Sequence, residues 1–154
     1  MTSPNQMRVS GVIWREAENG DIPSIKQMVW FSQMMLQHTM QNNGRKINVE
    51  AQIDCLKRCL QCCTLGEKFG MNYDYYMMVS HVNLYQIYRG RKGIADHNET
   101  SKTLKNSVSY ARQIIKEEDL ASNRYDDPQG TLQDARDVVE RYGVMSQLAS
   151  KIFS

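Results

Sequence analysis

Long uninterrupted apolar runs are absent from this chain of 154 residues. A membrane-spanning helix needs roughly 18 or more consecutive apolar residues. The longest candidate, residues 22–41, carries three glutamines and a histidine in its interior, so we expect no membrane span. Residues 1–6 are polar and lead into no apolar signal core, so we also expect no secretion signal.

A strong charge of one sign is also absent. The chain carries 19 basic and 17 acidic residues, for a net charge of +2. This charge is too small to indicate a polyanionic partner by itself, so any electrostatic function must come from local clustering. Apolar residues make up 41% and charged residues 23% of the chain, which is typical of a globular domain and not of a disordered segment.

Recognised catalytic and cofactor-binding motifs are missing as well. We find no GxGxxG, GxxxxGK[ST], HExxH or GxSxG pattern. Acidic pairs such as Glu117-Glu118 are typical of solvated helix ends. The sequence therefore predicts no catalytic residue and no cofactor. An enzyme whose pocket is assembled from distant residues stays a third alternative, because one sequence does not reveal such a pocket.

All four cysteines fall in one short segment, at Cys55, Cys59, Cys62 and Cys63. They cannot tie distant parts of the chain together, which indicates a reducing compartment, either cytoplasm or nucleus. Structural zinc sites draw ligands from separate segments, and only His38 or His81 could supply a second one. We therefore predict reduced, metal-free thiols that pack as small buried side chains.

Turn and capping residues divide the chain into helical segments. Helical periodicity predicts helices over residues 22–41, 49–69, 73–89, about 98–118 and about 131–153, with a loop at 121–130. The expected N-caps are Asp21 or Ser24, then Asn48, then Asn98 or Thr100. Gly70 is expected to end the second of these helices. The apolar stripe of the fourth is Leu104, Val108, Ala111 and Ile115. Residues 1–20 form an N-terminal arm that ends in a turn at Asn19-Gly20. Its segment 7–14 is a short strand, a short helix or an arm that packs onto the body, and Gly11 weakens the expectation of regular structure there. The sequence predicts one all-α domain over residues 1–154, a compact bundle of about five helices.

Residues 22–41 are the most informative segment, because they contain one charged residue, Lys26, and two apolar faces. At about 100° per residue, one face carries Ile25, Met28, Val29, Ser32, Met35, Leu36 and Met40. The other face carries Trp30, Phe31 and Met34. Such a helix is usually buried on both sides, either at the centre of a bundle or against a partner. The leading hypothesis is a non-enzymatic interaction protein that forms a homo-oligomer, or binds a helical partner, through these residues.

A basic edge on the fourth predicted helix supports an alternative, a nucleic-acid-binding and most plausibly RNA-binding protein. Lys102, Lys105, Arg112 and Lys116 share one side over about 21 Å, and a connector precedes them with Arg89, Arg91 and Lys92. A row of cations on a rigid helix can follow a phosphate backbone. In composition the chain resembles small helical structural or accessory proteins of RNA viruses, although no family motif can be quoted from its residues.

Overall fold

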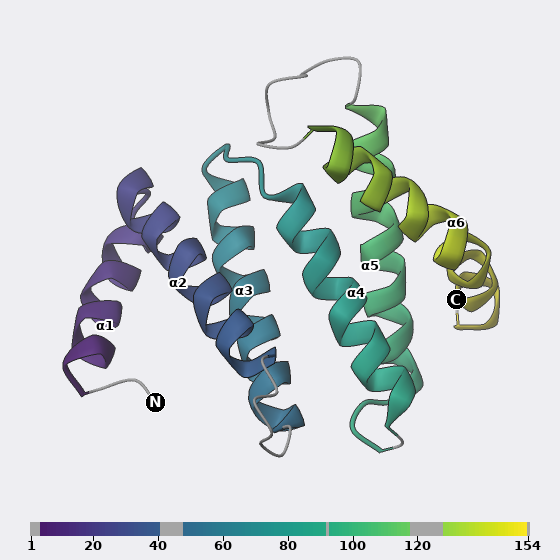
Figure 1. Ribbon diagram of the computed structural model, residues 1–154, viewed down its shortest axis with the longest axis horizontal. Helices are drawn as coiled ribbons and strands as arrows, with labels where there is room; N and C mark the ends of the chain where they lie inside the picture. Colours follow the sequence, from purple (N-terminus) through teal and green to yellow (C-terminus); the bar gives the residue numbers. More distant parts are fainter. Residues whose placement is uncertain (1–3, 41–47, 92, 118–127, 154) are drawn as a thin grey trace. The chain divides into compact units, whose positions relative to one another are not determined.

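The computed structural model describes residues 4–40, 48–91, 93–117 and 128–153, and within these ranges all regular structure is helical (Figure 1). The six helices are α1 (Pro4–Glu18), α2 (Ile22–Met40), α3 (Val49–Lys68), α4 (Asp74–Gly90), α5 (His97–Lys116) and α6 (Pro128–Phe153). The all-α prediction is confirmed. The expected loop at 121–130 lies mostly outside the described residues, and α6 begins at Pro128, three residues earlier than predicted.

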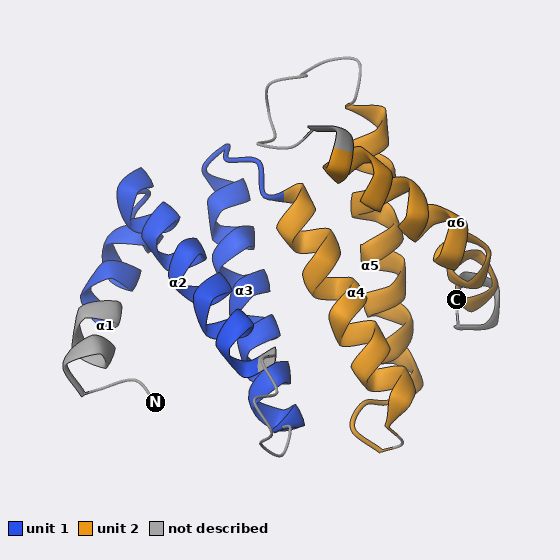
Figure 2. Ribbon diagram, viewed as in Figure 1, with its two compact units in different colours: residues 1–73 blue, residues 74–154 orange. Residues whose placement is uncertain are grey.

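The chain divides into two compact units, residues 1–73 and residues 74–154 (Figure 2). Each unit contains three of the described helices. The organisation of residues 1–154 as a single domain stays a prediction.

The N-terminal segment forms α1, and a short helix was one of the alternatives for residues 7–14. Gly20 follows α1 with a φ of +91°. The N–H groups of Gly20 and Asp21 donate to the carbonyls of Ala17 and Glu16, at 2.9 and 3.1 Å. This is a Schellman end, which uses the left-handed conformation that glycine adopts most easily. The Asn19–Gly20 turn predicted from sequence is therefore the C-terminus of α1.

Side chains at the helix starts of the first unit behave as predicted. Asp21 accepts a hydrogen bond from the backbone N–H of Ser24 at 3.2 Å, and Asn48 accepts one from Ala51 at 3.1 Å. Both satisfy donors that have no partner inside the helix. At the far end of α3, Gly70 has a φ of +84° and ends the helix, as the sequence indicated.

α2 is the central helix of the first unit and packs against both α1 and α3 (Figure 1). Its first predicted face is buried at Ile25, Met28, Val29, Ser32 and Leu36, while Met35 is half-buried. Ser24 is buried as well, and together these residues span only about 140° of the helix circumference. The two neighbouring helices thus share one side of α2, and the opposite side is left to other partners or to solvent.

In the second unit α5 packs against both α4 and α6. One core cluster joins Met78, Ala111, Ile114 and Ala135, and another joins Tyr85, Leu104, Val108 and Tyr142. The rings of Tyr85 and Tyr142 meet edge to face, with centroids 5.4 Å apart, a favoured aromatic arrangement.

Two details of α5 differ from the sequence-based expectation. Ile114 is buried and Ile115 only half-buried, whereas the predicted stripe used Ile115. The N-cap is Asp96, whose carboxylate accepts from the N–H of Glu99 at 2.8 Å, and not Asn98 or Thr100. Asp96 and Glu99 have the spacing of a capping box, a signal that was available in the sequence.

Candidate interaction surfaces

The second predicted face of α2 is exposed. Trp30 is 61% exposed and Met34 is 47% exposed, and the two lie one helical turn apart. Phe31, on the flank, is half-buried. Lys26, one turn before Trp30, and Gln37, next to Met34, are also exposed. We call Lys26, Trp30, Met34 and Gln37 the outer face of α2.

The outer face of α2 is unusual because it combines large apolar groups with almost no charge. Lys26 is the one charged residue in the sequence of this helix, if His38 is counted as neutral. Around Trp30 this face offers one cation, Lys26, and neutral groups such as Met34 and Gln37. Trp is also among the residues most enriched at the energetic centres of protein interfaces.

The basic residues predicted on α5 lie on its surface. Lys102, Arg112 and Lys116 are exposed and Lys105 is half-buried. The Nη2 atom of Arg112 lies 3.7 Å from the position that a Cβ on Gly143 would occupy, so this guanidinium lies against α6. Arg89 is exposed in the last turn of α4 and Arg91 is exposed just after it, and Lys92 lies outside the described residues.

Acidic groups accompany the basic edge at the start of α5. Asp96 caps the helix, and Glu99 accepts a hydrogen bond from the Tyr88 hydroxyl at 3.2 Å. Burial, together with the neighbouring Glu99 carboxylate, raises the pKa of Tyr88 to about 12. Glu117 follows Lys116 at the other end of α5, so both ends of this edge carry acidic neighbours.

The cysteine cluster is largely inside the first unit. Cys59, Cys62 and Cys63 are at most 1% exposed and Cys55 is half-buried, and all four are free thiols. Burial raises the pKa of Cys62 to about 11, and it also raises the pKa values of Cys59 and Cys63. At neutral pH these thiols are therefore protonated and poor nucleophiles.

Neither histidine considered as a metal ligand joins these thiols. His38 is exposed at the end of α2. His81 belongs to the second unit, where it is 8% exposed and stacks on Tyr110 with ring centroids 6.0 Å apart. Among the described residues, no group of three or more His, Cys, Asp or Glu side chains is placed to hold a metal ion.

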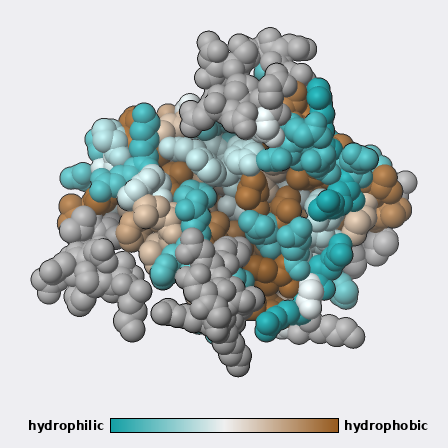
Figure 3. All heavy atoms as spheres, viewed as in Figure 1, coloured by the Kyte–Doolittle hydropathy of each residue, from teal (hydrophilic) through white to brown (hydrophobic). Residues whose placement is uncertain are grey.

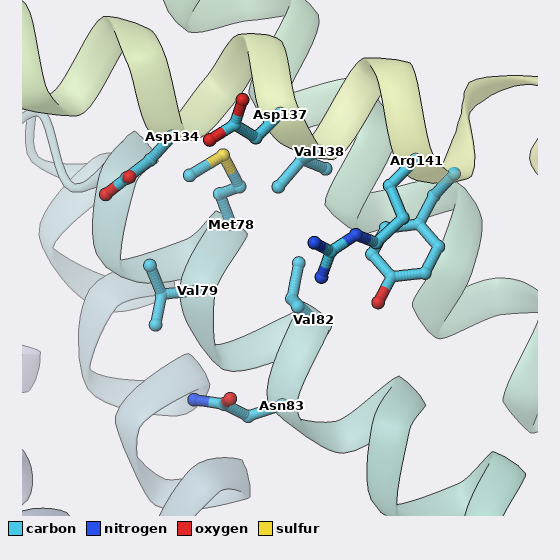
Figure 4. A pocket seen from close by; sticks show the side chains of 9 residues that line it. Met78, Val79, Val82, Asn83, Asp134, Asp137, Val138 and Arg141 are labelled. Atoms are coloured by element: carbon cyan, nitrogen blue, oxygen red, sulfur yellow. The ribbon is translucent and has the colours of Figure 1, made fainter.

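Sequence reasoning missed a groove between α4 and α6 in the second unit (Figure 4). Met78, Val79 and Val82 line it from α4, together with Asn83. The α6 side of the groove is formed by two acidic residues, one cation, one valine and one tyrosine: Asp134, Asp137, Arg141, Val138 and Tyr142. The groove has a volume of about 230 Å³, which is below the roughly 300–1,000 Å³ of typical small-molecule sites.

The sequence analysis also missed a second exposed apolar surface, near the end of α6. Val144 is 68%, Met145 38% and Leu148 53% exposed. Val144 and Leu148 lie four residues apart, a spacing that places them on one side of a helix and that was visible in the sequence. Hydrophobic residues reach the molecular surface between hydrophilic ones in the space-filling view (Figure 3).

No family model, no curated protein and no solved structure matches this chain. The function must therefore be argued from the chain's own surfaces. Within the described helices, none combines the length and the apolar character needed to cross a bilayer.

Proposed function

We propose that this protein is a non-enzymatic helical assembly protein whose copies associate through the outer face of α2. The observation that carries the proposal is Trp30, which is 61% exposed in the middle of a helix with one charged residue. A full tryptophan side chain offers about 200 Å². Covering the exposed part of Trp30 would remove roughly 120 Å² from water, equivalent to about 3 kcal/mol at ~25 cal/mol/Å².

The cellular setting that we propose follows from the thiols. Four free cysteines within nine residues, three of them buried, suit a reducing compartment such as the cytoplasm or nucleus. A homo-oligomer is the proposed state, because a nearly uncharged apolar face can meet another copy of the same chain without like-charge repulsion. A different helical protein would be the alternative partner.

The test of self-association is Trp30→Glu, compared with Val144→Glu. Both positions are highly exposed apolar residues on helices, at 61% and 68%, so both variants should fold as the wild type does. We expect the wild type to self-associate in sedimentation experiments, Trp30→Glu to sediment as a monomer, and Val144→Glu to behave like the wild type. Circular dichroism monitors folding in each case.

A wild-type chain that stays monomeric at high micromolar concentration would contradict the proposal. If Trp30→Glu unfolds, the side chain belongs to an internal core, where an unpaired charge is costly. Trp30→Tyr then serves as the second variant, because it keeps an aromatic group without adding charge. A weakened association of folded Trp30→Tyr supports the interface, and unchanged association counts against it.

A second candidate function, RNA binding, is favoured by the row of exposed cations on α5. Lys102 and Lys116 lie fourteen positions apart on the same side, a span of about 21 Å. Contacts of this type are made to phosphates, so binding should be independent of base sequence and should weaken steeply with salt.

The double substitution Lys102→Glu and Lys116→Glu tests RNA binding. The matched control is Lys57→Glu with Arg58→Glu, which changes the net charge equally but on exposed positions of α3. We expect loss of single-stranded RNA retention only in the α5 variant, with the salt slope falling by about 0.7 for each lost contact. Equal loss in both variants would show that only net charge matters, and absence of wild-type retention at low salt would eliminate this candidate.

A further inference from the structure

The α4–α6 groove has the form of an unfilled position in a helix bundle. α4 and α6 both pack on α5 and make few contacts with each other. The groove therefore lies between these two helices, on the outer side that they share. On its α4 wall, Val79 and Val82 are only half-buried. A fourth helix laid along this groove would bury these side chains, as the fourth helix does in a four-helix bundle.

The charged groups of the groove are arranged along α6 in order. Asp134 and Asp137 lie at one end, Val138 at the middle, and Arg141 at the other end, as the close-up shows (Figure 4). Asp134 also accepts a hydrogen bond from the Tyr75 hydroxyl of α4 at 2.7 Å, which fixes its carboxylate at the rim. The groove is thus acidic at its start and basic at its end.

The outer face of α2 carries the matching order at the same spacing. Lys26, Trp30 and Met34 recur every fourth residue over about 12 Å. Asp134, Val138 and Tyr142 recur every fourth residue over the same length of α6. If α2 is aligned parallel to α6, its cation meets the acidic end of the groove and its tryptophan meets the apolar middle. Its neutral methionine then meets the end near Arg141.

We infer that the outer face of α2 of one copy docks into the α4–α6 groove of a second copy, with α2 parallel to α6. This inference rests on the proposed function and names the surface that Trp30 binds. Lys26 lies beside Asp134 and Asp137, and Trp30 lies over Val82 and Val138. The reverse direction places Lys26 next to Arg141, and like charges brought together at an interface oppose binding.

A contact of this kind joins two different surfaces, and therefore each copy offers one surface of each type. Two variants test this contact. The first, Trp30→Glu, damages the α2 face and keeps the groove. The pair Asp134→Lys with Asp137→Lys reverses the acidic end of the groove and keeps the α2 face. Both aspartates are exposed, so the reversal should leave the fold intact.

The decisive experiment mixes the two variants at equal concentration and measures mass by sedimentation or light scattering. Each variant alone should be monomeric, and the mixture should form a 1:1 dimer, because one intact face meets one intact groove. Mixing Trp30→Glu with Met34→Glu is the matched control, since both lack the α2 face and should stay monomeric together. We expect at least tenfold weaker self-association for the groove variant than for the wild type.

The outcomes separate this inference from the function on which it rests. If the groove variant associates like the wild type while Trp30→Glu does not, the α2 faces pair with each other, and the inference fails while the proposed function stands. A monomeric wild type eliminates both. Adding Lys26→Glu to the groove variant should restore association if the direction is parallel, and failure of this rescue would overturn the assigned direction.

Discussion

The substitution Gly66→Ala adds one methyl group inside the first unit and tests how tightly the residues around Gly66 are packed. Gly66 is buried in α3. A Cβ at this position would lie 2.5 Å from Cε2 and 2.7 Å from Cδ2 of Tyr73, and 3.3 Å from Cγ2 of Ile25. Carbon atoms do not approach one another to 2.5 Å without a bond, so the Tyr73 ring or the α3 backbone must move to accept the methyl group.

Two opposing effects decide the magnitude. Alanine is favoured over glycine inside a helix by about 0.8–1.0 kcal/mol. Forcing an extra methyl group into a packed site costs about 1–3 kcal/mol. Since both distances to the Tyr73 ring are well inside van der Waals separation, we expect the second effect to be larger, with a net loss of about 1–2 kcal/mol in the free energy of unfolding.

Gly143→Ala is the matched control in α6. There the added Cβ would lie 3.6 Å from Cγ1 of Val139 and 3.7 Å from Nη2 of Arg112, which are ordinary contacts. This variant should gain up to about 1 kcal/mol from helix propensity. The same chemical change therefore has opposite signs at two glycines, and the difference comes only from their surroundings.

Urea unfolding followed by far-UV circular dichroism measures both variants, with m-values compared to establish that the cooperativity of unfolding is unchanged. A double-mutant cycle identifies the clash. In a Tyr73→Ala background, Gly66→Ala should become neutral or stabilising, because the ring has been removed. Gly66→Ala that is at least as stable as the wild type would refute the reasoning.

Two further predictions concern buried titratable groups. Burial, reinforced by Lys102, lowers the pKa of His81 to about 4 from 6.5. The unfolded chain therefore binds more protons than the folded chain between these values, so acidification from pH 6.5 to 4 should remove up to about 3 kcal/mol of stability that is fully present above pH 6.5. This part of the pH dependence should vanish in His81→Phe. For the thiols, a chromogenic disulfide reagent at pH 8 should label Cys55 first and Cys62 only after urea unfolding; rapid labelling of all four in the folded protein would contradict their burial.

The helical architecture was largely predictable because its signals are local. Helical periodicity, Asn48 as a cap and Gly70 as a terminator act within one or two turns of the chain. The two faces of α2 were predictable for the same reason, since the apolar residues on each side can be counted from the sequence. Which of the two faces is buried inside the unit was not predictable, because both carry large apolar residues.

The N-terminal helix was one of three alternatives that the sequence left open. Gly11 weakened the expectation of regular structure, and Asn19–Gly20 was interpreted only as a turn. The same pair is also the usual end of a helix, because glycine after the last helical residue adopts a positive φ. Ala17, which is fully buried, shows that tertiary packing against α2 supports α1 beyond the helix propensity of its own residues.

The groove was not predictable, because it depends on two helices whose lining residues are more than fifty positions apart. Asp134 and Val79 carry no shared local signal, and their meeting depends on how α5 holds α4 and α6. A sequence can reveal an apolar face that lacks a cover, as on α2. It does not reveal the groove that we propose as its partner, because the groove exists only after the second unit has folded.

The location of the two surfaces on different units has a consequence for assembly. The Trp30 face belongs to residues 1–73 and the groove to residues 74–154. In a contact between unlike surfaces, the rotation from one copy to the next is set by the angle between those surfaces within one chain. Copies form a ring if that rotation closes and an open filament if it does not. In the proposed contact, the angle between the units would therefore govern the form of the assembly, and Trp30 and the groove would govern its strength.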